Sequence, residues 1–262
     1  MNLHFLIIDP QNDFADPMGS LFIPGADKDM IRLSAMIQRH LSKINRIHVT
    51  LDTHRWIHIA HPIFWVDAHN NHPEPFTVIT EEDILAGHWK TTQPDAQERA
   101  ITYVKTLKAQ GRYQLTIWPP HCLIGQPGNN VVAPLAEVLT RWENTFTMVN
   151  YIVKGSNIWT EHYSAVKADV AIPEDPSTGL NQKLIEELGQ ADLVAVSGEA
   201  LSHCVANTLT DIAQILEDMS KFVFIGDTSS SVPGFEPLSE KFLTAMQAKG
   251  MKIVNSTEYL IE

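Results

Sequence analysis

The sequence predicts an α/β fold in which an open, doubly wound parallel sheet carries helices on both faces. Short apolar runs of strand length alternate along the chain with amphipathic segments of helix length. The runs at 5–8 and 193–196 lack the polar alternation of a half-exposed strand, which is typical of strands covered on both faces. Several runs also end on a chemically useful side chain, as at Asp9, Asp52 and Lys154. Because the carboxyl ends of parallel strands line a common crevice, these side chains are expected to meet there.

Each element is placed by its own pattern. The apolar run at 3–9 predicts the first strand, and the amphipathic stretch at 27–43 predicts the first helix. Further strands are expected at 46–52, 115–118, 147–154, 192–197, 222–227 and 252–254. Further helices are expected at 96–108, 130–142, 182–188, 202–219 and 236–249, and Ser202 is the expected N-cap of the helix over 202–219.

Residues 62–114 interrupt the alternation of strands and helices. The segment holds histidines, prolines and an acidic run before the helix at its end. A long insertion in a compact domain more often has a function than none. We therefore expect a single domain over 1–262 whose insertion at 62–114 packs over the crevice or forms a subunit contact.

Composition restricts the classes of partner. At 262 residues with 44% hydrophobic content, the chain can bury one full core. Nineteen Lys and Arg residues against 31 Asp and Glu residues give a net charge of −12, and an acidic surface repels phosphate backbones, so nucleic acid is not an expected partner. The first apolar run is too short for a signal peptide, no stretch reaches membrane-span length, and only two cysteines occur; these observations predict a cytoplasmic protein without membrane contact. The sequence is also compatible with a homo-oligomer.

Cys204 occupies a place where a thiol can become a nucleophile. It follows an apolar run and a break of small residues, and it opens a helical pattern. The first turn of a helix offers unpaired N–H groups and the positive end of the helix dipole, which lower the pKa of a thiol. An isolated cysteine is more commonly a buried structural residue. Asp9 and Lys154, at the ends of other predicted strands, favour the catalytic interpretation.

Six separated motifs, in this order, resemble those of the isochorismatase-like cysteine hydrolases, the family that contains the nicotinamidases. The motifs are 6–14 with 19–26, Asp52-Thr53-His54, 118–122 with Gly125 and 127–128, 151–155, Tyr163-Ser164-Ala165, and 194–205. The resemblance implies the three-layer isochorismatase-like fold and a catalytic set of Asp9, Lys154 and Cys204.

The residue types of this set suit nucleophilic catalysis. Cys204 would attack a carbonyl carbon, Asp9 would take the thiol proton and deliver it to the leaving amine, and Lys154 would keep Asp9 ionised. Backbone N–H groups of Ala200 and Cys204 would hold the oxyanion. In the relatives, the peptide bond that corresponds to Glu199–Ala200 is cis.

Asp52, His54 and His121 are expected to hold one divalent metal. A carboxylate and an imidazole two residues apart at a strand end can point into one crevice, and His121 can close the set from the neighbouring strand end. The family carries its divalent ion on these motif positions. Zinc is the first expectation, and iron and manganese also fit a mixed imidazole and carboxylate set. No organic cofactor is expected.

The substrate pocket is the least determined part of the site. Aromatic and imidazole side chains near the motifs are candidate contacts, and core packing is the alternative interpretation for them. The candidates are Phe14, Trp56, His58 and His203.

The sequence thus predicts a hydrolase that cleaves a small amide in the manner of a nicotinamidase, through a thioester and with release of ammonia. Ser202, His203 and Glu199 depart from the residues usual in the family and leave the substrate open. The alternatives are a hydrolase of the same fold acting on another small amide, a carbamoyl compound or a vinyl ether, or a non-catalytic binding protein. Cys204 argues against vinyl ether cleavage, since the isochorismatases lack this cysteine.

Overall fold

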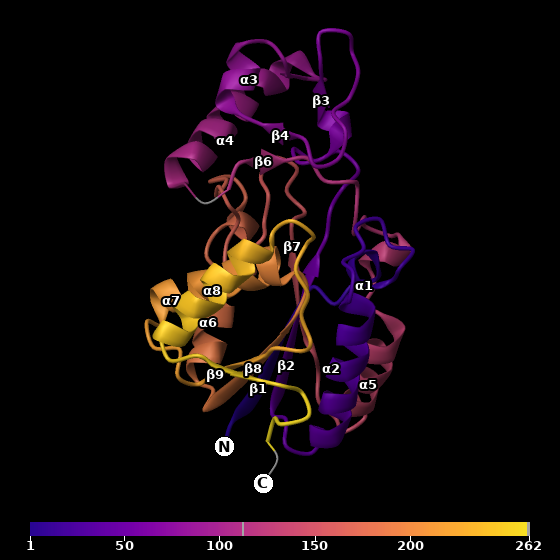
Figure 1. The fold of residues 1–262 in the computed structure, drawn as a ribbon, viewed down its shortest axis with the longest axis vertical. Helices are drawn as coiled ribbons and strands as arrows, with labels where there is room; N and C mark the ends of the chain where they lie inside the picture. Colours follow the sequence, from indigo (N-terminus) through magenta and orange to yellow (C-terminus); the bar gives the residue numbers. More distant parts are fainter. Residues whose placement is uncertain (112, 261–262) are drawn as a thin grey trace.

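Six parallel strands form the central sheet of the computed structural model, which describes residues 1–111 and 113–260 (Figure 1). In spatial order they are β10 (Lys252–Val254), β9 (Phe222–Ile225), β8 (Leu193–Gly198), β1 (Leu3–Ile8), β2 (Arg46–Asp52) and β7 (Asn150–Lys154). All neighbouring pairs are parallel, which confirms the predicted sheet. The strand order reverses at β1, and the crevice at such a switch point is the usual ligand site of an open α/β sheet.

The middle of the sheet is the core of the molecule. Every residue of β1 is buried, as its continuous apolar run predicts for a strand covered on both faces. Its register against β8 sets Ile8 beside Gly198, and the register of β2 against β7 sets Asp52 beside Lys154. The strand ends that carry Asp9, Asp52 and Lys154 therefore lie at one edge.

Helices cover both faces of the sheet (Figure 1). On one face, α2 (Ala26–His40) packs against α5 (Ala133–Glu143). On the other lie α6 (Gln182–Gly189), α7 (Ala206–Ile215) and α8 (Glu236–Ala248). Short helical turns complete the connections: α1 (Asn12–Ala15) and the 3₁₀ turns Pro127–Asn129 and Pro176–Thr178. Among the described residues, no helix combines the length and apolar character needed to cross a membrane.

Residues 62–114 lie beyond the carboxyl-end edge of the sheet (Figure 1). Within the segment, β3 (Trp65–Val66) pairs antiparallel with β5 (Lys90–Thr91). Its strand β4 (Val78–Ile79) pairs antiparallel with β6 (Leu115–Thr116), which directly follows the segment. Its helical elements are α3 (Glu81–Leu85), α4 (Gln97–Gln110) and the 3₁₀ turns Pro62–Phe64 and Pro94–Ala96. Helix α3 begins with a capping box, in which the Thr80 hydroxyl and the Asp83 carboxylate each bind the other residue's N–H.

Two expectations about elements are wrong. The strand expected at 115–118 does not join the central sheet, because the insertion supplies β4 as its partner. The helix expected over 202–219 begins as a π-helical turn, Leu201–Val205, and Ser202 does not cap it. The Ser202 hydroxyl instead accepts the Val232 N–H at 3.1 Å, since a neighbouring loop runs alongside this segment.

Candidate active site

A small cavity lies at the carboxyl ends of the central strands. Its polar wall contains Cys204, Asp52, His121, Glu161 and His203. Its apolar wall is largely aromatic, with Phe14, Trp118 and Tyr163, and is completed by Leu21, Ile23, Ala200 and Val232. The cavity therefore combines a nucleophile, a cluster of metal-binding residue types and flat apolar surfaces.

Lys154 connects the expected catalytic residues. Its Nζ lies 2.9 Å from Asp9 Oδ2, 3.2 Å from Asp52 Oδ1 and 3.6 Å from Cys204 Sγ. It also donates to the carbonyl of His162 at 2.9 Å. One buried cation thus contacts the expected base, the expected nucleophile and a carboxylate of the expected metal site.

The Asp9 carboxylate is held in one orientation. The Thr50 hydroxyl donates to Asp9 Oδ1 at 2.5 Å and accepts the Asp9 N–H at 3.0 Å. Asp9 has a φ of 43°, a left-handed conformation that non-glycine residues rarely adopt and that occurs preferentially at functional sites. Burial raises the pKa of Asp9, and the charge of Lys154 opposes this shift.

The thiol of Cys204 differs from the expectation. A helix N-terminus was expected to lower its pKa, whereas burial raises the pKa well above its ordinary value, with Lys154 as the opposing influence. The physical reason is that the side chain lies inside the core, with only 6% of the residue exposed. The thiol therefore holds its proton until a base takes it, and Lys154, 3.6 Å from Cys204 Sγ and 2.9 Å from Asp9 Oδ2, lies between the thiol and the expected base.

The segment before Cys204 has a special backbone. The peptide bond Glu199–Ala200 is cis, as the resemblance implied. Gly198 has a φ of 121°, and a Cβ at this position would lie 2.0 Å from the Ile8 carbonyl oxygen, so only glycine fits. The Ala200 N–H has no hydrogen-bond partner within 1–111 and 113–260, and Ala200 lines the cavity beside Cys204.

The three residues expected to hold a metal lie together. The Oδ2 atom of Asp52 is 3.0 Å from His54 Nε2 and 3.3 Å from His121 Nε2. His54 Nδ1 donates to the Gly155 carbonyl at 3.0 Å, and His121 Nδ1 donates to the Pro119 carbonyl at 2.8 Å. Because carbonyl groups take the Nδ1–H of each ring, it is Nε2 that faces Asp52, and without a metal Nε2–H donates to the carboxylate. Burial lowers the pKa of His54, but the Asp52 carboxylate outweighs burial and raises it, so a metal at this point would take the place of the Nε2 proton.

His121 reaches this cluster by a different route from the expected one. It does not come from a neighbouring strand of the central sheet, because β6 pairs elsewhere. The chain after β6 instead forms a single bridge between Leu123 and His54. The Asp13 carboxylate accepts the Cys122 N–H at 2.6 Å and fixes the loop, while the Cys122 side chain packs in the core as expected.

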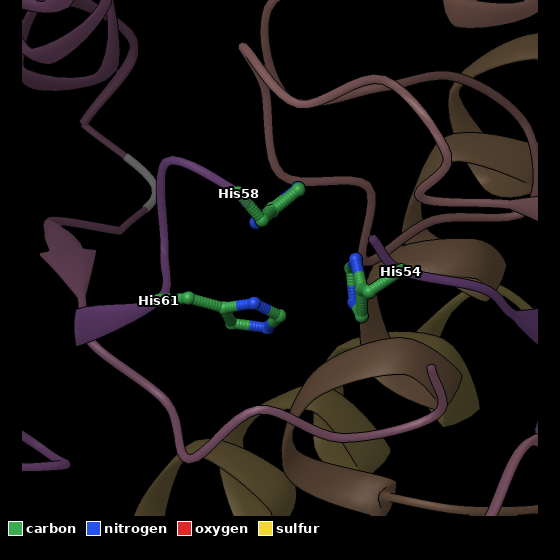
Figure 2. A group of neighbouring side chains, drawn as sticks. All are labelled: His54, His58 and His61. Carbon is green, nitrogen blue, oxygen red and sulfur yellow. The ribbon is translucent and has the colours of Figure 1, made fainter. Parts of the chain in front are cut away.

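Two more histidines, His58 and His61, lie beside His54, and the three form a second group that could hold a metal (Figure 2). His58 uses both ring nitrogens, since Nε2 donates to the Thr160 carbonyl and Nδ1 accepts the Ala60 N–H, each at 3.2 Å. His61 donates from Nδ1 to the Trp56 carbonyl at 3.1 Å, and its buried Nε2 has no partner among the described side chains and backbone. His61 is therefore a candidate fourth ligand that the sequence did not single out.

Glu161 is a second site residue that sequence reasoning missed. It lines the cavity, and its Oε1 lies 3.9 Å from His54 Nε2. Oε1 accepts the His162 N–H, whereas the buried Oε2 has no hydrogen-bond partner in the described part of the chain. Its position seven residues after Lys154 was the only available signal, and spacing alone cannot place a loop side chain in a crevice.

The four expected substrate contacts separate into two pairs. Phe14 and His203 line the cavity, whereas Trp56 and His58 do not. Trp56 is 59% exposed, because the loop after the metal motif turns its side chain outward. His58 is buried and bound on both ring nitrogens, as described above.

His203 is a neutral imidazole in the cavity wall. Its Nδ1 forms a hydrogen bond with the Ser202 hydroxyl at 2.9 Å, and the same hydroxyl accepts the Val232 N–H. Burial lowers the pKa of His203 to about 4, which keeps the ring uncharged at neutral pH.

Residues 62–114 stand behind the cavity wall. None of them lines the cavity. Three aromatic side chains of this segment instead contact wall residues: Phe76 packs edge-on against Trp118, Tyr103 accepts the Glu161 N–H at 3.0 Å, and Tyr113 stacks on His203.

Known proteins share this fold and part of this sequence. No family model matches the chain. The nicotinamidase of Saccharomyces cerevisiae is 26% identical over 213 residues, which cover 80% of this chain and 81% of that protein. The structure of the yeast nicotinamidase Pnc1p matches with a TM-score of 0.67 at 20% identity, over 97% of this chain and 99% of that one. A pyrazinamidase of Pyrococcus horikoshii, solved in complex with zinc, matches with a TM-score of 0.58 at 20% identity, over 97% and 99% of the two chains. These similarities confirm the α/β three-layer fold and the resemblance to the nicotinamidases.

Proposed function

We propose that this nicotinamidase-like protein hydrolyses a small planar amide, with nicotinamide as the first candidate, to a carboxylic acid and ammonia. The observation that carries the proposal is the position of Lys154 Nζ within 3.6 Å of Asp9, Asp52 and Cys204 at once. A structural cysteine has no need of a buried base and a buried cation beside it. The sequence similarity to a nicotinamidase supports the amide as the substrate class.

The first half of the reaction forms a thioester. Cys204 Sγ attacks the carbonyl carbon as its proton passes to Asp9, and Asp9 then protonates the amide nitrogen so that the C–N bond breaks and ammonia leaves. Burial raises the pKa of both the acid and the thiol, and the charge of Lys154 opposes both shifts. Lys154 stabilises whichever of the two is the anion.

The second half restores the enzyme. Water attacks the thioester carbonyl, Asp9 takes a proton from this water, and the proton returns to the sulfur as the C–S bond breaks. In both halves, the carbonyl oxygen becomes negative and needs donors. The free N–H of Ala200 and the N–H of Cys204 are the groups that we assign to this role.

A divalent metal fits the cluster of Asp52, His54 and His121. The donor set supports this assignment, because carbonyl groups fix the Nδ1 of both imidazoles so that each Nε2 is directed at one carboxylate, and His61 adds a further Nε2 without a partner among the described residues. Glu161, with its unpartnered Oε2, is placed to bind the metal or a water on it. Zinc is our first choice, and such an ion would bind and polarise a donor atom of the substrate.

The aromatic wall and His203 define the shape and polarity of the substrate. Phe14, Trp118 and Tyr163 offer flat apolar surfaces for a small ring. The neutral imidazole of His203 adds one hydrogen-bonding group to this wall. A planar heteroaromatic amide satisfies both features.

The test is a panel of small amides with ammonia release as the readout. Nicotinamide and pyrazinamide should be hydrolysed, and Cys204→Ala should bind nicotinamide without turning it over, because the pocket is kept and the nucleophile is lost. Mass spectrometry of acid-quenched enzyme should detect the acyl group on Cys204. Turnover by Cys204→Ala above a tenth of the wild-type rate would disprove the cysteine mechanism.

We further propose that the insertion at 62–114 sets which substrates are accepted by bracing Trp118, Glu161 and His203 from behind. The catalytic set is complete without the segment, so its effect is on selectivity rather than on chemistry. A cytoplasmic location is also our proposal, supported by two buried cysteines that are both free thiols.

A further inference from the structure

A buried carboxyl group lies directly before Ala200 and takes no part in the chemistry proposed above. Glu199 is 0% exposed. Its Oε2 accepts the Ser230 N–H at 3.0 Å, and its own N–H donates to the Ile8 carbonyl at 2.8 Å. No ion pair to Glu199 occurs within residues 1–111 and 113–260. A buried carboxyl without a cation of its own needs another explanation.

The partner of Glu199 is a second carboxyl group. Ser230 joins Glu199 to Asp29, in the first turn of α2, since its N–H donates to Glu199 Oε2 and its hydroxyl donates to Asp29 Oδ2. The buried Oε1 of Glu199 has no hydrogen-bond partner among the described residues. Two carboxylates offer only acceptors, so a hydrogen bond between Glu199 and Asp29 requires one proton. Asp29 already accepts from Arg32 at Oδ1 and from the Ser230 hydroxyl at Oδ2, the latter at 2.5 Å. Asp29 is therefore the acceptor, and Glu199 is the donor.

The surroundings agree with a protonated Glu199. Burial and the charge of Asp29 raise the pKa of Glu199 well above its ordinary value, against smaller opposing effects of the Ser230 N–H and Arg32. The charged groups that face it are Asp29 and Arg32 of α2. Behind Arg32 lies Asp227, whose Oδ2 is 3.9 Å from Arg32 Nε.

The same contacts hold the chain on both sides of Ala200. Before Ala200, the Glu199 side chain accepts the Ser230 N–H. After it, the Leu201 N–H donates to the Ser230 carbonyl at 2.8 Å. Ser230 thus binds the residues that flank Ala200, and the hydroxyl of Ser230 anchors this arrangement to α2 through Asp29.

We propose that Glu199 is a positioning residue that acts as a neutral acid, donating to Asp29 and accepting from Ser230 so that the Ala200 N–H stays directed at the reacting carbonyl oxygen. The inference rests on the proposed function only in the role of Ala200. The shared proton is a separate claim that needs no activity to test.

The first measurement is the melting temperature as a function of pH. The pKa of Glu199 in the folded state lies above that in the unfolded chain, so the stability that it contributes is fully present below the unfolded pKa and is lost as pH rises toward the folded pKa. Glu199→Gln keeps one donor and one acceptor and cannot ionise. The melting temperature of Glu199→Gln minus that of the wild type should increase by about 3 °C for each pH unit above pH 5.

The matched control is Glu240→Gln, which makes the same substitution at an exposed position of α8. The difference in melting temperature between Glu240→Gln and the wild type should not change with pH. In a second variant, Asp29→Asn, the new amide can donate to Glu199, so the pH dependence should also disappear. A flat difference for Glu199→Gln would show that Glu199 carries no proton in the folded protein and would overturn the inference.

The second measurement is kinetic. Glu199→Gln should exceed Glu199→Ala in kcat at least tenfold, with KM similar in both, because only the amide can replace the neutral acid. Equal kcat values in the two variants would refute the positioning role. A further outcome is that the wild type hydrolyses no amide while the melting temperature of Glu199→Gln, relative to the wild type, still increases with pH. That result would disprove the proposed function and would support the proton on Glu199.

Discussion

Replacement of Lys154 by methionine tests the electrostatic design of the site most directly. Methionine has nearly the same length and shape but no charge, so Lys154→Met leaves Asp9 and Asp52 buried with no cation between them. Removal of one partner from a buried ion pair costs about 3–5 kcal/mol of unfolding free energy. A protein of this length loses about 2–4 °C in melting temperature per kcal/mol, so we expect a decrease of about 6–20 °C.

The effect on activity follows from the same contacts. Without Lys154, burial raises the pKa of Asp9 further, and a protonated Asp9 cannot accept the thiol proton at neutral pH. Turnover of nicotinamide should fall by about 10²–10⁴-fold. The acid limb of the pH profile should move to higher pH, and alkylation of Cys204 by iodoacetamide should slow, since Lys154 lowers the pKa of the thiol.

Lys167→Met is the matched control. Lys167 is a half-exposed lysine whose Nζ lies 4.0 Å from the buried carboxylate of Asp211, and solvent screens the lysine charge, so the pair should contribute only about 1 kcal/mol. Melting curves should be recorded with and without a chelator, because a metal at Asp52 would balance part of the uncompensated charge. Lys154→Met with a melting temperature within about 2 °C of the wild type and an unshifted pH profile would refute the reasoning.

Three further predictions follow from other parts of the molecule. Elemental analysis of the purified protein should find close to one divalent ion per chain, lost in the variant His54→Ala/His121→Ala; unchanged metal content would exclude the site. Burial lowers the pKa of His4 to about 4 and that of His48 to about 3, so both rings are neutral when folded, and their stabilisation, complete above pH 6.5, is lost as pH falls from 6.5 toward 3. The urea midpoint should therefore drop between pH 7 and pH 5, and less steeply in His4→Gln/His48→Gln; equal slopes would contradict the assignment. Replacement of 62–114 by a short linker should leave alkylation of Cys204 intact and change relative rates across the amide panel, whereas unchanged relative rates would reject a role in selectivity.

The central sheet and its functional edge were predictable from the sequence. Continuous apolar runs identify strands that are covered on both faces, and a parallel sheet necessarily gathers their carboxyl ends. Asp9, Asp52 and Lys154 lie at such ends, so their meeting required no knowledge of register. Cys204 follows a strand in the same way, after a short turn.

The sequence could not predict how other residues reach the site. His121 was expected at a strand end, but its strand pairs with β4 in the insertion, because strand pairing depends on a partner that lies nearly forty residues away in the chain. Ser202 was expected to cap a helix, but the loop that contains Val232 uses its hydroxyl. Both outcomes depend on contacts between remote segments, which local patterns do not contain.

The chemical state of the site residues was decided by the tertiary structure alone. His58 and His61 lie three residues apart and are identical in type, yet only His61 keeps a free Nε2, because remote and local carbonyl groups select which ring nitrogens are used. The pKa of Cys204 is raised rather than lowered, since burial outweighs the beginning of a helix. Residue type and position along the chain determine which groups can take part in the chemistry. Desolvation and hydrogen-bond partners, which come from every segment packed around a residue, determine the protonation state in which it acts.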